Sequence, residues 1–180
     1  FASGIIVKPT TGPCNCVTFG NNEGIRLMSN AFYHTGLTSL TIPANVTYIG
    51  EYCFVALKNL TEFTVDANNP NYAAIDGLLV TKSGRKLIAV PAGRTGTLNV
   101  PVCVEEIGFG AFEESSLSAI NFDPNANILT FGYRAFFKAE SITEMTIPAS
   151  VVSIDYYAFA YCENLKTVTF AEGNKLKGIY

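Results

Sequence analysis

The fold is decided by residues 147–170, which read IPASVVSIDYYAFAYCENLKTVTF. The same spacing of apolar residues recurs along most of the chain, around further Ala-Phe pairs. Self-similarity at a period of about 20 to 50 residues is the signature of a solenoid, in which each unit buries its apolar side against its neighbours. The stretch therefore predicts a stacked repeat architecture for the chain.

Five Ala-Phe-like pairs mark the units, and their phenylalanines lie 22, 58, 24 and 23 residues apart. The pairs are Ala31-Phe32, Cys53-Phe54, Ala111-Phe112, Ala135-Phe136 and Ala158-Phe159. Each Phe is followed by an L-x-x-Φ-x-Φ segment, where Φ is apolar, and its alternating end predicts a short strand with one buried face. Apolar residues at 154, 158, 162 and 165 have helical spacing, which predicts a short helix or helical turn from about Asp155 to Cys162.

The interval of 58 residues between Phe54 and Phe112 holds an insertion, at about residues 66–97. Within the insertion, two apolar runs flank Lys82-Ser83-Gly84-Arg85, and a Ser-Gly pair suits the tip of a β-hairpin. We therefore expect a lead-in over residues 1–13 and one solenoid over residues 14–180, with this hairpin inserted.

The composition excludes several classes of function. The chain is 48% hydrophobic and 15% charged, which is typical of a folded domain with a sizeable core rather than of a disordered segment. A net charge of −3 provides no basic surface for nucleic acid. No run approaches the ~20 apolar residues that span a bilayer. We expect a monomer that neither binds nucleic acid nor inserts into a membrane.

Residues that could carry chemistry are few. His34 is the only histidine and has no evident catalytic partner. The adjacent carboxylates of Glu105-Glu106 and Glu113-Glu114 read as solvated connection residues. The cysteines form an odd, scattered set that predicts neither a disulfide framework nor a zinc site. They are Cys14, Cys16, Cys53, Cys103 and Cys162. We expect no catalytic residue, no metal and no cofactor, and hence no enzyme.

The pattern from Ile147 to Val168, I-P-x-x-V-x-x-I-x-x-x-A-F-x-x-C-x-x-L-x-x-V, resembles the repeat of about 23 residues in the BspA-like leucine-rich-repeat proteins. Members of that family are bacterial and largely cell-surface proteins. The resemblance implies an α/β repeat fold, a right-handed leucine-rich-repeat solenoid. Its short strands would form a concave sheet, with short helical turns on the opposite side.

Two rows of outward-facing strand positions carry the functional expectation. They bring threonine, asparagine and glutamate side chains together on the concave sheet. The ten residues that we expect to bind a protein are called the ladder face: Ser39, Thr41, Glu62, Thr64, Asn99, Asn121, Glu144, Thr146, Thr167 and Thr169. The alternative is structural, because threonine suits any exposed strand by being both β-branched and polar.

The resemblance implies a non-enzymatic, extracellular or cell-surface module that serves in adhesion by binding a host or matrix protein. Solenoids commonly use a broad curved surface for such recognition. Two alternatives stay open at this point. The chain is either a structural spacer within a larger surface protein or a module that binds glycans.

Overall fold

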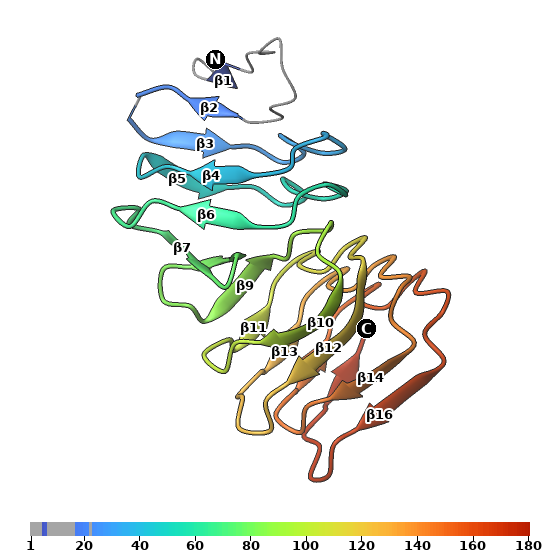
Figure 1. Cartoon of the computed structure of the whole chain (residues 1–180). Helices are drawn as coiled ribbons and strands as arrows, with labels where there is room; N and C mark the ends of the chain where they lie inside the picture. The colour runs from blue at the N-terminus through green and yellow to red at the C-terminus, as the bar shows by residue number, and fades with distance from the viewer. Residues whose placement is uncertain (1–4, 7–16, 22) are drawn as a thin grey trace.

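The computed structural model describes residues 5–6, 17–21 and 23–180, which form a stack of short strands (Figure 1). In each unit the chain passes through two strands that belong to two rows, here called the ladder row and the anchor row. The ladder row comprises β4 (Leu40–Ile42), β6 (Phe63–Val65), β10 (Gly96–Val100), β12 (Leu117–Phe122), β14 (Glu144–Ile147) and β16 (Thr167–Phe170). The anchor row comprises β3 (Ile25–Leu27), β5 (Val46–Ile49), β9 (Lys86–Ala89), β11 (Glu106–Ile107), β13 (Thr130–Phe131), β15 (Ser153–Ile154) and β17 (Gly178–Ile179). An antiparallel pair, β1 (Ile5–Ile6) and β2 (Thr18–Phe19), precedes them.

Neighbouring strands of one row run parallel, one unit apart. The ladder row forms three separate pairs, β4–β6, β10–β12 and β14–β16. The anchor row forms the pair β3–β5 and a seven-stranded sheet in the order β17-β15-β13-β11-β9-β8-β7. In β4 the inward side chains of Leu40 and Ile42 are buried and flank the exposed Thr41, and β14 alternates in the same way, whereas every residue of the last ladder strand, β16, is exposed. The solenoid expected from the repeat is therefore present.

The helix expected from Asp155 to Cys162 is wrong, since the described residues contain no helix. In each Ala-Phe turn, the residues two positions before and two positions after the Phe have positive φ. In the last unit these are Tyr157 (φ 58°) and Tyr161 (φ 59°). An L-residue in this left-handed conformation ends a right-handed helix. Moreover Ile154, expected to begin the helical face, lies in strand β15.

Hydrogen bonds between neighbouring turns replace the expected helical ones. The N–H groups of Arg134, Phe136 and Lys138 donate to carbonyl oxygens of the next turn at 3.0, 2.8 and 3.0 Å. The N–H groups at 110, 112 and 114 donate in the same way to the carbonyls at 133, 135 and 137. We call this one-directional series the turn ladder. The N–H groups of a turn have partners in this series only where another turn follows in the stack.

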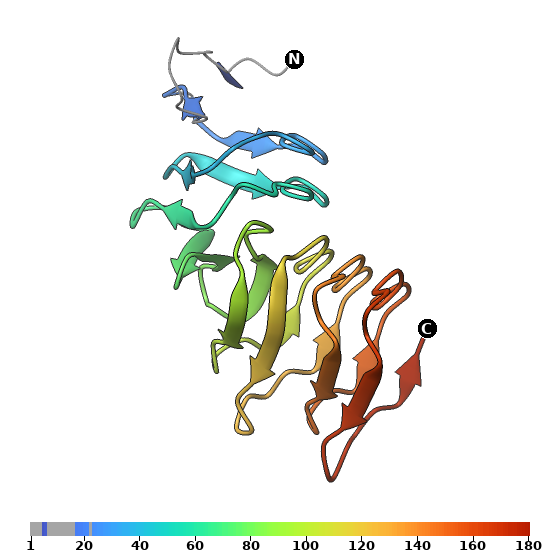
Figure 2. The same cartoon turned by 45° about the vertical axis from the view of Figure 1, so that its right-hand side comes forward.

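The insertion forms a three-stranded antiparallel meander of β7 (Tyr72–Ile75), β8 (Leu78–Thr81) and β9. Asp76 and Gly77, with φ of 50° and 75°, make the first tight connection, and Gly84 at φ 75° lies in the second. The meander separates a first stack, which ends at β6, from a second stack, which begins at β9. Figure 2 shows that the strands of the two stacks run in different directions on either side of it.

Two apolar cores correspond to the two stacks, and β8 is the wall between them. Leu79 packs with the first core, which is built around Phe32, Phe54 and Phe63. Leu78 and Val80, on the other face of the same strand, pack with the second core. Because successive side chains of a strand point to opposite faces, one strand serves both cores.

Candidate functional site

All ten residues of the ladder face are exposed, and they lie on or directly before strands of the ladder row. Strand register places equivalent residues opposite one another. Thr41 lies opposite Thr64, Asn99 opposite Asn121, and Thr146 opposite Thr169. The structure therefore brings these residues into rows, in the arrangement that the repeat spacing predicts.

Some side chains of the ladder face bond to one another along the stack. The hydroxyl oxygens of Thr41 and Thr64 lie 2.6 Å apart, and Asn121 Nδ2 donates to Asn99 Oδ1 at 3.0 Å. These contacts hold exposed polar groups in one orientation. A partner would consequently meet an ordered surface, and less side-chain freedom would be lost on binding.

The ladder row opens into a groove between β12 and β14. These strands lie side by side but are not hydrogen-bonded to each other. The groove has a volume of 530 Å³, which lies within the roughly 300–1,000 Å³ that ligand sites generally have. Four ladder-face residues line it: Asn121, Glu144, Thr146 and Thr169. The other six lie on the ladder row outside the groove.

The chemistry of the groove suits a ligand that presents hydrogen-bond donors. Asp123 and Glu172 join Glu144 in its lining, and no Lys, Arg or His is among the lining residues. Hydroxyl and amide groups add both donors and acceptors. Ile120 and Met145 supply an apolar floor. Such a lining can contact either protein or glycan and contains no nucleophile–base pair.

A buried charged cluster lies on the turn side, where the sequence predicted only solvated carboxylates. Glu113 is 5% exposed and pairs with the Arg134 guanidinium, so the expectation is wrong for Glu113. Burial raises the pKa of Glu113 to about 7, although Arg134 acts in the opposite direction. The guanidinium also lies over the rings of Phe137 and Tyr52, at 3.5 and 5.1 Å from their centroids. The one sequence signal for this ion pair is that Arg134, of opposite charge, follows Glu113 by about one repeat.

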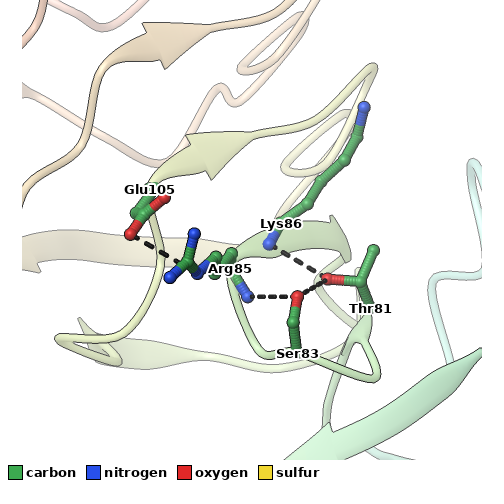
Figure 3. A network of polar contacts seen from close by, with 5 residues as sticks. All are labelled: Thr81, Ser83, Arg85, Lys86 and Glu105. Atoms are coloured by element: carbon green, nitrogen blue, oxygen red, sulfur yellow. Dashed lines mark hydrogen bonds and ion pairs between the residues drawn. The ribbon is translucent and has the colours of Figure 1, made fainter.

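Glu105 pairs with the inserted meander and is solvated as expected. Figure 3 shows Arg85 reaching Glu105, with Nε 3.6 Å from Oε1, while the Ser83 hydroxyl accepts from the Arg85 N–H. The Lys86 N–H donates to Thr81 Oγ1 at 3.2 Å in the same network. Arg85 is exposed and Glu105 is partly exposed, so their ion pair stabilises the fold by only about 0–1 kcal/mol. The network orients the β8–β9 connection and carries no chemistry.

The remaining candidates are isolated. His34 is exposed in its turn, with its ring edge-on to Tyr33 at 4.5 Å. Burial raises the pKa of Cys53 to about 12, whereas Cys103 is exposed. Cys14 and Cys16 lie outside the described residues. Within the described ranges, no three His, Cys, Asp or Glu side chains are grouped to hold a metal ion.

None of the described residues forms a helix long and apolar enough to cross a membrane.

Residues 15–74 and 94–179 match the family described as BspA type leucine rich repeat region, in six copies. The unmatched residues between these ranges belong to the inserted meander and the chain that follows it. A comparison with curated proteins finds no match.

Three solved structures share the fold. The pneumococcal vaccine antigen PcpA is 21% identical with a TM-score of 0.62, over 87% of this chain and 50% of that chain. A leucine-rich repeat protein from Eubacterium ventriosum is 19% identical with a TM-score of 0.54, over 82% and 54% of the two chains. A leucine rich cell surface protein from Faecalibacterium prausnitzii is 21% identical with a TM-score of 0.53, over 85% and 55%. The chain thus spans about half the length of these proteins.

Proposed function

Because the chain belongs to the BspA-type leucine-rich-repeat family, we propose that it is a non-enzymatic module that recognises a host or matrix protein through the ladder face. The observation that carries the proposal is the groove between β12 and β14, which gathers Asn121, Glu144, Thr146 and Thr169 around 530 Å³. Exposed, ordered polar groups around a concave space are typical of a recognition surface.

The proposal includes a cell-surface location and a role in adhesion. The names of two structural neighbours support the location, since one is a vaccine antigen and the other a cell surface protein. A repeat solenoid also suits adhesion, because its units present one continuous face to a large partner.

The test measures binding to purified matrix proteins, namely collagen, fibronectin and laminin, by surface plasmon resonance. We expect saturable binding to at least one of them. Changing Thr64, Asn121 and Thr146 together to Lys should weaken that binding at least tenfold, because three long cations would fill and recharge the ladder face. The matched control carries the same charge change at exposed residues off the face, as Asn59→Lys, Asn127→Lys and Ser141→Lys.

Unchanged affinity of the ladder-face variant would rule out this surface as the contact. Binding to glycans alone would favour the glycan-binding alternative. Absence of binding to every protein and glycan at the highest soluble concentration would favour the structural spacer.

A further inference from the structure

One turn is missing from the turn ladder. Between Phe54 and Phe112 the layer of β9 and β10 contains no Ala-Phe turn, because the chain passes from Val90 through residues 91–95 into β10. The layer itself is present, since the Gly93 N–H donates to Leu60 O at 2.9 Å and the Ser116 N–H donates to Ala92 O at 3.2 Å. The two flanking turns are therefore separated by one layer that has no turn.

A cavity of 320 Å³ occupies the place of the missing turn, and we call it the turn slot. One wall is the turn at residues 50–55 of the first stack, and the other is the turn at 109–113 of the second. Residues 88–90 line it from the core side. Since neighbouring layers lie about 4.8 Å apart, the walls leave room for one extended chain between them.

Backbone groups on both walls lack the partners that the turn ladder provides elsewhere. The N–H groups of Tyr52 and Phe54 correspond to those of Arg134 and Phe136, yet they donate to no described backbone oxygen. Across the slot, the Phe109 carbonyl accepts from no described N–H group, whereas the Ala111 carbonyl already accepts from the Val90 N–H at 2.8 Å. Backbone groups without a partner inside a cavity favour a ligand that pairs with them.

Glu113 adds an unpaired side-chain atom to the same wall. Its side chain is 3% exposed, and its Oε2 is buried without a hydrogen-bond partner. This oxygen lies against Gly110, another residue of the wall, because a Cβ placed at Gly110 would be 3.0 Å from it. The Glu113 carbonyl likewise accepts from no described N–H group, so the wall offers acceptors from both backbone and side chain.

Aromatic and aliphatic side chains line much of the remaining slot, together with the polar side chains of Glu51, Thr81 and Lys86. The rings of Tyr52 and Phe109 meet edge to face with centroids 4.4 Å apart, which bridges the two walls. Val55, Ile88 and Val90 give the slot an apolar side. A matching ligand thus combines alternating donors and acceptors with one apolar side chain.

We propose that the turn slot binds a short peptide segment of another protein, which supplies the partners that the missing turn would supply. Carbonyl oxygens of the peptide accept from Tyr52 and Phe54, and an N–H group of the peptide donates to the Phe109 carbonyl, beside the Ala111 carbonyl that Val90 already occupies. Peptide addition to free backbone edges follows this logic in other folds. The slot is separate from the ladder face, so either site can fail while the other stands.

The test uses an end-capped peptide with the sequence of residues 133–139, which this chain already lays against the turn at 109–113. Residue-resolved hydrogen exchange by NMR is measured on the full chain with and without millimolar peptide. We expect the Tyr52 and Phe54 amides to exchange at least tenfold more slowly with peptide. The Phe136 amide, already bonded to Ala158 O, should stay unchanged.

A slot-filling variant tests the location. Val55→Phe should abolish the slowing while leaving the melting temperature within a few degrees, because Val55 faces Gly110 across the slot and belongs to neither core. Val102→Phe is the matched control, since Val102 is 57% exposed and lies outside the slot. Val90→Phe fills the slot from the other side, but it also enlarges a side chain of the second core and should lower the melting temperature.

Unchanged exchange at Tyr52 and Phe54 under saturating peptide would overturn the proposal and leave the slot as a cavity for solvent. Slowing that appears only at the last turn, in Tyr157 and Phe159, would also overturn it, since the peptide would then stack on the open end. Slowing that survives in both slot-filling variants would exclude the cavity as the binding place.

Discussion

Asn69 is a single buried side chain that closes the edge of a strand. It is fully buried, and its Nδ2 donates to the carbonyls of Pro43 and Val46 at 2.7 and 3.1 Å. Its Oδ1 accepts from the N–H groups of Asn71 and Tyr72, both at 2.9 Å. The Asn69 side chain thus donates to the edge of β5 the hydrogen bonds that a neighbouring strand would otherwise donate, at the point where the inserted meander interrupts the anchor row.

Asn69→Ala should destabilise the fold by about 3 kcal/mol, because it removes all four hydrogen bonds of a buried side chain. Urea denaturation followed by circular dichroism measures the change. Asn71→Ala is the control, since Asn71 is exposed and its Nδ2 makes one bond, to Thr47 O. Equal losses in the two variants would show that burial of Asn69 is not what matters.

Glu113 should make stability depend on pH. Burial raises its pKa from 4.5 to about 7, so the folded chain holds this proton more tightly than the unfolded chain does. Its contribution is therefore most favourable below pH 4.5, declines as the pH rises, and levels off above about pH 7. Glu113→Gln cannot titrate. We expect the free energy of unfolding of the natural chain, minus that of the variant, to fall across this interval in urea titrations.

A constant difference in the free energy of unfolding between the natural chain and Glu113→Gln from pH 4.5 to 8 would contradict the raised pKa.

At the scale of single residues, the sequence predicts the exposed rows well because strand alternation determines them. It does not predict the roles of Asn69 or Glu113, since their partners lie 21 to 26 positions away. Such pairings depend on how units stack, and periodicity alone does not reveal which polar residue becomes buried.

The left-handed residues are the defining feature of the turn as an element. Ala56, two positions after Phe54, has a φ of 61° and is buried. Ala111, directly before Phe112, is equally buried but is not among the positive-φ residues. A left-handed conformation costs an L-residue about 1–2 kcal/mol, and glycine escapes that penalty.

The same substitution should consequently act in opposite directions at these two sites. We expect Ala56→Gly to stabilise the fold by about 0.5–1 kcal/mol, and Ala111→Gly to destabilise it by about 1 kcal/mol. Thermal unfolding by calorimetry provides the comparison. Destabilisation by both substitutions would mean that lost packing, rather than backbone strain, dominates in the turn.

The wrongly predicted helix and the anchor strands that the sequence did not predict both involve short segments. Apolar spacings of 4, 8 and 11 residues fit a helix, but they fit equally well a turn whose left-handed residues recur every four positions. The anchor strands β11, β13 and β15 contain two residues each, too few to show an alternation. The Asp76-Gly77 pair, by contrast, is a strong hairpin signal that would have revealed β7 and β8 as separate strands.

At the scale of the whole molecule, β8 couples two stacks that otherwise have separate cores. Leu78 and Leu79 are both fully buried neighbours in the chain, yet they pack into different cores. Changing either to Ala should cost about 2–5 kcal/mol through cavity formation. In a repeat protein such a loss is felt most by adjoining units.

Leu79→Ala should therefore speed hydrogen exchange mainly in β6, in the first stack, and Leu78→Ala mainly in β10, in the second. The two variants are matched controls for each other, because residue type, strand and burial are the same. Equal acceleration of both strands in both variants would mean that the stacks unfold as one unit. The repeat period predicts the stacking itself, whereas the division into two cores arises from an insertion that follows no period.

The one-directional turn ladder also gives the molecule an electrical polarity. Because the N–H groups of each turn point toward the C-terminal end, their peptide dipoles add along the stack instead of cancelling as they do in ordinary sheets. The turn slot divides this column into two dipoles placed head to tail, with the positive end at Tyr52 and Phe54 facing the negative end at Phe109. A peptide lying in the field between them is favoured in one orientation only, its carbonyl groups toward the first stack.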